Sequence, residues 1–259
     1  MTLKIHPTAL VDKNAVLHDK VEIGAYTVIG ANVELGENTW VGNHVNITGN
    51  TIIGKNNKIY HSASIGEAPQ DTKYKGEPTK LEIGEKNIIR EFCTLNRGTI
   101  QGGEITKIGN NNLLMASVHI AHDCIVGNNI IFANCVALGG HVKVKDWVTL
   151  GGYCIVHQFT VIGEHSMAGG ATGIAQDLPP YVLALGYRAE PKGINTIGLQ
   201  RRGFTSEQIE HIKNAYKILY RNGLSYNEAK LYIGELANEN KELQLFVDFF
   251  NESTRGIIR

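Results

Sequence analysis

Charge of one sign is the first thing that this sequence lacks. Its 25 lysine and arginine residues balance its 25 aspartate and glutamate residues, so nothing favours nucleic acid or an anionic membrane surface as a partner. No run of about 18 apolar residues is present to span a bilayer, and the segment MTLKIHPTALVDKN has no apolar core of a signal peptide. The sequence predicts a soluble cytoplasmic protein with no nucleic-acid partner and no membrane span.

Cysteine is also scarce. The four cysteines show neither CxxC pairing nor the spacing of zinc ligands, which favours free thiols in a reducing compartment; they are Cys93, Cys124, Cys135 and Cys154. We therefore expect neither a bound metal nor a cofactor.

Glycine, in contrast, is plentiful at 29 residues, and its spread through the chain calls for a search for repeats. Apolar residues recur at every sixth position from Ile5 to Ile65 and again from Ile108 to Ile174, with Ile83, Ile89 and Leu95 at the same step between them. A small or β-branched residue often stands two positions earlier, so both point inward from a short strand. Gly and Asn are frequent in the next positions, where we expect corners with unusual backbone angles.

Each hexapeptide is thus one edge plus one corner. Three hexapeptides close a triangular coil, and successive coils stack as parallel sheets. Two interruptions, residues 66–82 and 96–107, are expected to leave the coil as loops. The sequence predicts an all-β solenoid, a parallel β-helix, and its dense glycine corners disfavour a helical solenoid.

After the prolines at 179 and 180 the pattern ends, and the segment from about residue 191 onward predicts helices. Two capping boxes mark helix starts, at Thr205 with Gln208 and at Ser225 with Glu228. We predict two domains: a β-helix over residues 1–190 and a C-terminal α-helical domain over residues 191–259.

One corner of the coil gathers ionisable side chains. The segment VHIAHDCIVG contains His119, His122 and Asp123. A step of three hexapeptides carries His122 to Gly140. His122 can serve as a general base near neutral pH, with Asp123 or a backbone carbonyl holding its tautomer. A glycine permits close approach of a ligand to backbone N–H groups that stabilise an oxyanion.

Residues three hexapeptides apart stack on one another in successive coils. The polar corner therefore extends along the axis and also includes Gly139, His141, His157, Gln158 and Phe159. No histidine of the cluster occupies an inward position. The remaining histidines are interpreted as solvated surface residues: His6, His18, His44, His61, His165 and His211.

Six segments together resemble the UDP-N-acetylglucosamine acyltransferase family over nearly the whole chain: GEAPQDTKY, HIAHDC, LGGHV, VHQF, QDLPPYV and GLQRRGF. Hexapeptides alone indicate only the broad acyltransferase superfamily. The resemblance implies a left-handed coil and an O-acyltransferase that moves an (R)-3-hydroxyacyl chain from acyl carrier protein to the 3-hydroxyl of UDP-N-acetylglucosamine, the first step of lipid A biosynthesis. It also implies a homotrimer with active sites in clefts between subunits.

The resemblance assigns roles to particular residues. It implies that His122 is the general base, that Asp123 orients its ring, and that the Gly140 amide receives the oxyanion. It assigns sugar and phosphate contacts to Asp71 and Lys73 in the first loop, with four further residues lining the cleft, namely His119, His141, His157 and Gln158. It assigns nucleotide and diphosphate contacts to Asn195, Arg201 and Arg202.

Two further positions bear on specificity. Gly170 resembles the residue that caps the acyl groove, and a glycine there implies a long hydroxyacyl chain, with Met167 and Arg188 as modifiers. Ile197 stands where the family often has an acidic residue, which leaves room for an altered sugar nucleotide.

Two other classes of protein stay open. β-Helix carbonic anhydrases bind zinc with three histidines, and His119 with His122 are the candidate ligands here. Metal analysis of chelator-free protein separates that class from an acyltransferase. A non-catalytic solenoid scaffold is disfavoured because it needs neither the two loops nor the polar corner, and failure to bind any sugar nucleotide would favour it.

Overall fold

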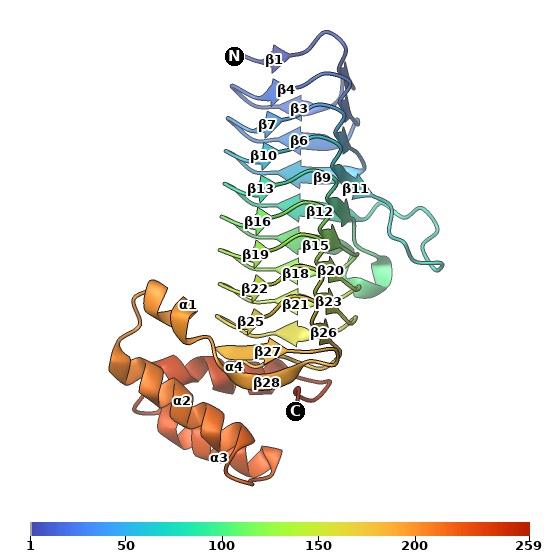
Figure 1. The fold of residues 1–259 in the computed structure, drawn as a ribbon. Helices are drawn as coiled ribbons and strands as arrows, with labels where there is room; N and C mark the ends of the chain where they lie inside the picture. The colour runs from blue at the N-terminus through green and yellow to red at the C-terminus, as the bar shows by residue number, and fades with distance from the viewer. Residues whose placement is uncertain (1) are drawn as a thin grey trace.

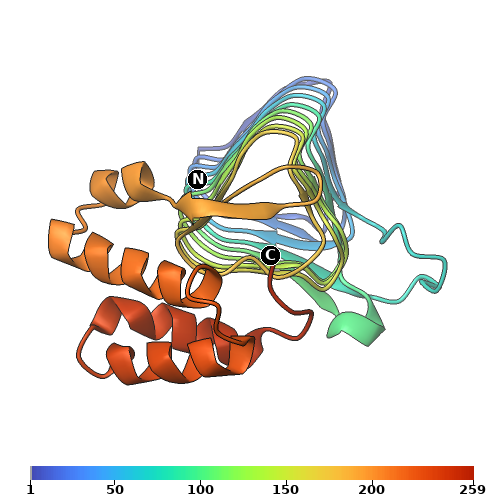
Figure 2. The same cartoon turned by 60° about the horizontal axis from the view of Figure 1, so that its bottom comes forward.

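The hexapeptides form a triangular coil of short strands in this computed structural model, which describes residues 2–259 (Figure 1). Apart from the last pair, β27 and β28, paired strands run parallel, and each pairs with the strand one turn further along the chain, as β7 does with β10. A view tilted toward the C-terminal end shows the stacked coils as nested triangles (Figure 2). The predicted parallel β-helix is confirmed.

The three faces of the coil are three sheets. The first contains, in order along the axis, β1 (Lys4–Ile5), β4 (Glu22–Ile23), β7 (Trp40–Val41), β10 (Lys58–Ile59), β13 (Ile88–Ile89), β16 (Leu113–Leu114), β19 (Ile131–Phe132), β22 (Thr149–Leu150), β25 (Met167–Ala168), β27 (Val182–Leu185) and β28 (Glu190–Ile194). The second contains β2 (Leu10–Val11), β5 (Val28–Ile29), β8 (Asn46–Ile47), β11 (Ser64–Glu67), β14 (Thr94–Asn96), β17 (His119–Ile120), β20 (Ala137–Leu138), β23 (Ile155–Val156) and β26 (Gly173–Ile174). The third contains β3 (Val16–Leu17), β6 (Val33–Leu35), β9 (Asn50–Ile53), β12 (Lys80–Ile83), β15 (Ile105–Ile108), β18 (Ile125–Val126), β21 (Lys143–Val144) and β24 (Val161–Ile162).

The core is the column of inward residues inside the triangle. From Ile23 to Ile174 the apolar residue of each hexapeptide is buried, and each such side chain stabilises the fold by roughly 1.5–3 kcal/mol relative to exposure. In the first coil Ile5 remains 41% exposed, because no earlier coil covers it.

Apart from Gly66, the glycines that directly follow inward residues do not supply unusual backbone angles, so that part of the sequence interpretation was wrong. Positive φ angles fall instead on non-glycine corner residues such as Tyr26 and Asn38, at 56° and 58°. A Cβ on Gly36 would lie 2.5 Å from the carbonyl carbon of Gly54 in the next coil. These glycines are needed because the coils stack closely at that point.

The two interruptions leave the coil as loops but are shorter than predicted. The first loop runs between β11 and β12, and the second, between β14 and β15, contains the 3₁₀ turn η1 (Ile100–Gly102). Strands β12 and β15 reach back into the predicted loops and pair with each other along their whole length, from Lys80 opposite Ile105 to Ile83 opposite Ile108.

The coil continues past the two prolines with a changed register. Leu178 bridges to Ile162, and Leu183 of β27 pairs with Met167, so the turn there is shorter than the three full hexapeptides of the regular coils. The expectation of helices from about residue 191 was wrong at its start, because β28 runs to Ile194 and pairs antiparallel with β27.

Four helices follow: α1 (Thr196–Arg201), α2 (Ser206–Tyr220), α3 (Tyr226–Ala237) and α4 (Gln244–Glu252), with the 3₁₀ turn η2 (Lys241–Leu243) before α4. Both predicted capping boxes are present, at the starts of α2 and α3. The helices have their own buried cluster beside the C-terminal coils (Figure 1). The division into residues 1–190 and 191–259 stays a prediction. No helix among residues 2–259 is both long enough and apolar enough to cross a bilayer.

Candidate active site

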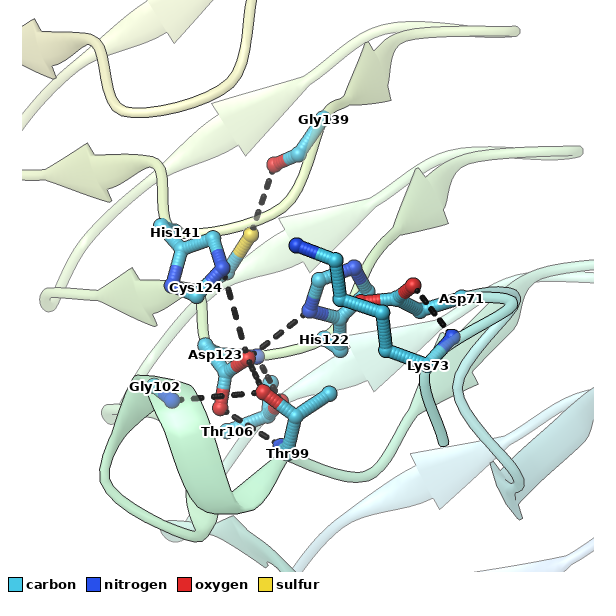
Figure 3. Close-up of polar contacts among 10 residues, drawn as sticks. All are labelled: Asp71, Lys73, Thr99, Gly102, Thr106, His122, Asp123, Cys124, Gly139 and His141. Atoms are coloured by element: carbon cyan, nitrogen blue, oxygen red, sulfur yellow. Dashed lines mark hydrogen bonds and ion pairs between the residues drawn. The ribbon is translucent and has the colours of Figure 1, made fainter. Parts of the chain in front are cut away.

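The centre of the polar corner is a hydrogen-bonded pair of neighbouring residues (Figure 3). His122 Nδ1 lies 2.7 Å from Asp123 Oδ2. The His122 side chain is 13% exposed, whereas that of Asp123 is fully buried. An acceptor at Nδ1 keeps the proton on that nitrogen and leaves Nε2 free to accept another. The geometry is that of a general base held by a carboxylate.

Asp123 is held from the protein side by two threonines that the sequence interpretation missed. The N–H of Thr99 donates to Asp123 Oδ1 at 2.7 Å and its hydroxyl to Oδ2 at 2.6 Å. The N–H of Asp123 donates to Thr106 Oγ1 at 2.8 Å. The buried carboxylate is therefore fully engaged, as a buried charge must be to be tolerated. Both threonines lie in the second interruption. Thr99 lies in its aperiodic part, which gave no signal, whereas Thr106 stands two positions before Ile108 at an inward position of the repeat.

Gly140 lies one coil below His122, as the step of three hexapeptides predicted. A Cβ there would be 2.6 Å from Cε1 and 2.8 Å from Nε2 of His122, so only glycine leaves room for the ring. Within residues 2–259 no backbone hydrogen bond uses the Gly140 N–H. This donor beside Nε2 meets the requirement for stabilising an oxyanion.

His141 packs against the ring of His122. Its ring lies edge-on to that of His122, with centroids 5.1 Å apart, and stacks on Phe159 at 4.3 Å. Burial lowers the pKa of His141, and the charges of Asp123 and Asp71 act against this shift. A neutral imidazole beside His122 is suited to hydrogen bonding with a substrate rather than to adding charge.

His119 is close to the pair but has its own partner. Its Nδ1 lies 2.7 Å from the hydroxyl of Thr94. Burial lowers the pKa of His119, and His122 adds to the effect. His157 and Gln158 follow one coil after Gly139 and Gly140 and are exposed at the lower edge of the corner.

The first loop brings Asp71 and Lys73 to this corner. The Lys73 N–H donates to Asp71 Oδ1 at 2.9 Å, and the charge of Asp71 raises the pKa of His141 against the effect of burial. Arg97, another residue that the sequence interpretation missed, holds the loop through hydrogen bonds to the Gly66 carbonyl and, at 2.8 Å, to the Tyr74 hydroxyl.

The expected nucleotide-contacting residues lie elsewhere in this chain. Helix α1 and the loop that carries Asp71 project from opposite sides of the coil (Figures 1 and 2). Asn195 is buried as the N-cap of α1, where it accepts from the Gly198 N–H and donates to the His165 carbonyl. Arg201 is exposed, whereas Arg202 packs over Trp147. One chain alone does not bring these residues to His122.

His165 was wrongly interpreted as a solvated histidine. Its ring stacks between Trp147 and Tyr181, and Arg202 Nη1 lies 3.2 Å from its Nδ1. Burial and then the charge of Arg202 lower the pKa of His165 to about 4. His211 also departs from that interpretation, because it pairs with Glu242 at 2.6 Å.

Gly170 lies at a different corner of the coil from His122. It follows β25 in the first sheet, whereas His122 follows β17 in the second. A Cβ on Gly170 would meet only the Gly152 carbonyl oxygen, at 3.4 Å. Met167 is half-buried in β25, just before this corner, and Arg188 lines an apolar pocket with His157 and Gly173.

One cluster among residues 2–259 has the donor spacing of a metal site: His122, Asp123 and His141, within 4.8 Å of one another. His119, the ligand considered from the sequence, is absent from it. The Asp123 oxygens already accept three hydrogen bonds, from Thr99 and His122. This donor set favours a hydrogen-bonded acid–base pair over a zinc site.

Comparison with known proteins agrees with this geometry. Residues 177–258 match the family model "Udp N-acetylglucosamine O-acyltransferase; Domain 2", and residues 105–140 match the bacterial transferase hexapeptide of six repeats. The UDP-N-acetylglucosamine O-acyltransferase of Moraxella catarrhalis is 46% identical, with a TM-score of 0.96 over 98% of this chain and 99% of that one. This chain belongs to the UDP-N-acetylglucosamine acyltransferase family.

Other members of the UDP-N-acetylglucosamine acyltransferase family are also similar to this chain over nearly its whole length. The enzyme of Francisella novicida is 45% identical, with a TM-score of 0.97 over 98% of this chain and 94% of that one. The Arabidopsis enzyme is 36% identical, with a TM-score of 0.87 over 98% of this chain and the whole of that one. The chain is thus an acyltransferase, and its coil is the left-handed β-helix of the family.

Proposed function

We propose that this acyltransferase moves an (R)-3-hydroxyacyl chain from acyl carrier protein to the 3-hydroxyl of UDP-N-acetylglucosamine, the reaction that opens lipid A biosynthesis. The observation that carries the proposal is the His122–Asp123 pair, at 2.7 Å, with its free Nε2 beside Gly140. The names of the relatives supply the acceptor, and the geometry supplies the means of activating a hydroxyl.

The chemistry follows from the free nitrogen. His122 Nε2 takes the proton of the sugar 3-hydroxyl as its oxygen attacks the thioester carbonyl. The carbonyl oxygen becomes an oxyanion, which accepts a hydrogen bond from the Gly140 N–H. The intermediate then collapses: the C–S bond breaks, the ester remains on the sugar, and the imidazolium returns its proton to the leaving thiolate.

Asp123 has a supporting part in this sequence. Its carboxylate keeps the proton on Nδ1 and stabilises the imidazolium that forms during the attack. Because the carboxylate is buried and already accepts two hydrogen bonds from Thr99, it does not itself compete for the substrate.

The sugar and its phosphates occupy the same corner. Asp71 and Lys73 approach from the first loop, and four residues of the coil line the cleft, namely His119, His141, His157 and Gln158. Lys73 is exposed and supplies a positive charge for phosphate.

The active protein is a homotrimer in this proposal. Asn195, Arg201 and Arg202 contact the nucleotide, yet α1 projects from the side of the coil opposite the Asp71 loop (Figures 1 and 2). A ligand that touches both groups must therefore bind where one subunit presents its His122 corner to the α1 side of its neighbour. Gly170, at another corner of the coil, caps the acyl groove at the same interface.

The direct test is mass spectrometry of the product formed from UDP-N-acetylglucosamine and a panel of hydroxyacyl carrier proteins of different chain length. We expect a single ester on the sugar and a preference for a long chain. An amide product from a 3-amino sugar analogue, formed in strong preference to the ester, would contradict the proposed acceptor. Zinc found in chelator-free protein at one ion per chain would favour the carbonic anhydrase alternative.

A further inference from the structure

The second loop ends against the buried side of Asp123. Thr99, which is 1% exposed, caps the 3₁₀ turn η1 and donates to both carboxylate oxygens. The second loop lengthens the coil into which it is inserted. Thr94 therefore pairs with His119, 25 residues further on, whereas paired residues in uninterrupted coils are only three hexapeptides apart. A coil built only as scaffold has no use for this extra turn.

We propose that Thr99 is a positioning residue of the acyl transfer. It fixes the Asp123 carboxylate and weakens the attraction of Oδ2 for the proton shared with His122. The inference rests on the proposed function, in which His122 is the base. Thr99 itself touches neither the substrate nor the reacting atoms.

The direction of the hydroxyl proton supports this role. Thr99 Oγ1 accepts a hydrogen bond from the Gly102 N–H at 3.2 Å, so its own proton is directed to Asp123 Oδ2, at 2.6 Å. A hydroxyl has a single proton to donate. Oδ2 therefore receives two donors, Thr99 Oγ1 and His122 Nδ1, while Oδ1 receives the Thr99 N–H.

The packing of the turn points the same way. A Cβ on Gly102 would overlap the carboxylate of Asp123, so the turn approaches this group as closely as a backbone can. The loop thereby excludes water from the carboxylate and replaces it with two fixed donors. Fixed donors to a carboxylate favour its charged form over the protonated one.

The chemical consequence concerns the basicity of His122. A carboxylate with fewer donors attracts the Nδ1 proton more strongly and stabilises the imidazolium. Neutral imidazole, the form that accepts the proton of the sugar, then exists only at higher pH. Loss of the Thr99 hydroxyl is therefore expected to move the rise of the rate to higher pH.

Thr106 provides a matched comparison. Its hydroxyl is also buried and also bonds Asp123, but through the backbone N–H at 2.8 Å rather than through the carboxylate. Thr106→Val removes that bond and preserves the shape of the side chain. Thr99→Val likewise preserves shape and the Thr99 N–H. It removes the hydroxyl donor to Oδ2 and also the hydroxyl acceptor of the Gly102 N–H, which keeps its bond to the Thr99 carbonyl at 3.1 Å.

The test measures kcat/KM against pH for the folded full-length protein with Thr99→Val, Thr99→Ser or Thr106→Val. We expect Thr99→Val to lose about 10- to 100-fold at neutral pH, the usual worth of a hydrogen bond to a charged group. The pH at which kcat/KM rises should be higher in Thr99→Val than in wild type. Thr99→Ser should restore both, and Thr106→Val should leave the position of the rise unchanged. A Thr99→Val profile that coincides with that of wild type would overturn the proposal, as would an equal displacement in Thr106→Val.

A second readout does not depend on turnover. In protein with ¹⁵N-labelled histidine, the Nδ1–H resonance of His122, assigned by its loss in His122→Ala, should shift in Thr99→Val and in the smaller Thr99→Ala but not in Thr106→Val. An unshifted resonance in both Thr99 variants would reject the role of Thr99. Failure of wild type to acylate any acceptor, with the resonance shifted as expected, would instead reject the proposed function and leave the positioning role standing.

Discussion

His122 Nδ1 and Asp123 Oδ2 lie 2.7 Å apart although the two residues are neighbours in the chain. In an extended strand, adjacent side chains point to opposite faces. Asp123 has a φ of 61°, in the left-handed region where Asp is enriched among non-glycine residues. This corner conformation turns the carboxylate back toward the preceding ring, so the turn that closes one edge of the coil also forms the proposed catalytic pair.

Replacing Gly170 with Met should shift the donor preference toward shorter acyl chains. A Cβ at Gly170 meets only the Gly152 carbonyl oxygen, at 3.4 Å, so there is room for a larger side chain, which would occupy the proposed acyl groove. Each buried CH₂ that is excluded is worth about 0.8 kcal/mol, or roughly fourfold. Competition between hydroxyacyl carrier proteins of different length measures the shift, and Gly170→Ala should show a smaller one. Unchanged preference in both variants would mean that another residue limits the chain.

Two inactive variants should restore activity to each other when they are co-expressed. One carries His122→Ala and the other carries both Arg201→Ala and Arg202→Ala. If each site takes His122 from one subunit and the arginines from its neighbour, random assembly leaves about a quarter of the sites intact. The rate of purified mixed trimers checks this. Activity no greater than the sum of the separate variants would place both groups in one subunit.

Replacing Ile197 with Glu should strengthen binding of the nucleotide without changing the chemical step. Ile197 is 64% exposed on the first turn of α1, so the substitution disturbs no core. A gained hydrogen bond is worth about 1 kcal/mol, which predicts a KM for UDP-N-acetylglucosamine lower by roughly fivefold at constant kcat. Ile197→Leu is the control. An unchanged KM would remove this position from nucleotide recognition.

His165 should make the fold less stable as the pH falls. Burial lowers its pKa from 6.5 to about 4, so the unfolded chain binds more protons between these values and stability declines through that window. His165→Phe cannot titrate, and phenylalanine already occupies the matching left-handed corner position at Phe159. The free energy of unfolding of wild type, relative to that of the variant, should fall by on the order of 2 kcal/mol between pH 7 and pH 4, allowing for solvent screening. Thermal unfolding at several pH values tests this, and parallel curves would contradict it.

Much of the fold follows from local sequence because each hexapeptide carries its own edge and corner. The stacking of His122 on Gly140 follows too, since three hexapeptides separate equivalent positions in successive coils. The change of register near Pro180 does not follow, because the regular spacing of the hexapeptides carries no signal of the shorter turn, in which Pro180 packs closely on Gly163 of the previous coil.

The candidate site was predictable only where it lies on the repeat. Thr99 was missed because a loop without periodicity delivers it to Asp123. The burial of His165 was missed because Arg202 and Phe204, from the helical segment, cover its ring. Contacts made between a repeat and a distant non-repeat segment leave no signal in the spacing of either.

The central claim is that His122 is the general base. His122→Ala should fold and assemble as wild type does, because the side chain lies at an outward corner and its removal leaves no core cavity. The matched variant Asp123→Asn should lose less, because it disturbs the ring without removing the base.

The measurement that tests this most directly is the steady-state rate of folded His122→Ala with UDP-N-acetylglucosamine and a saturating hydroxyacyl carrier protein. We expect kcat to fall by about 10² to 10⁴, the usual contribution of a positioned base, and the wild-type rate to rise with pH as the imidazole loses its proton. Activity within about threefold of wild type would contradict the assignment.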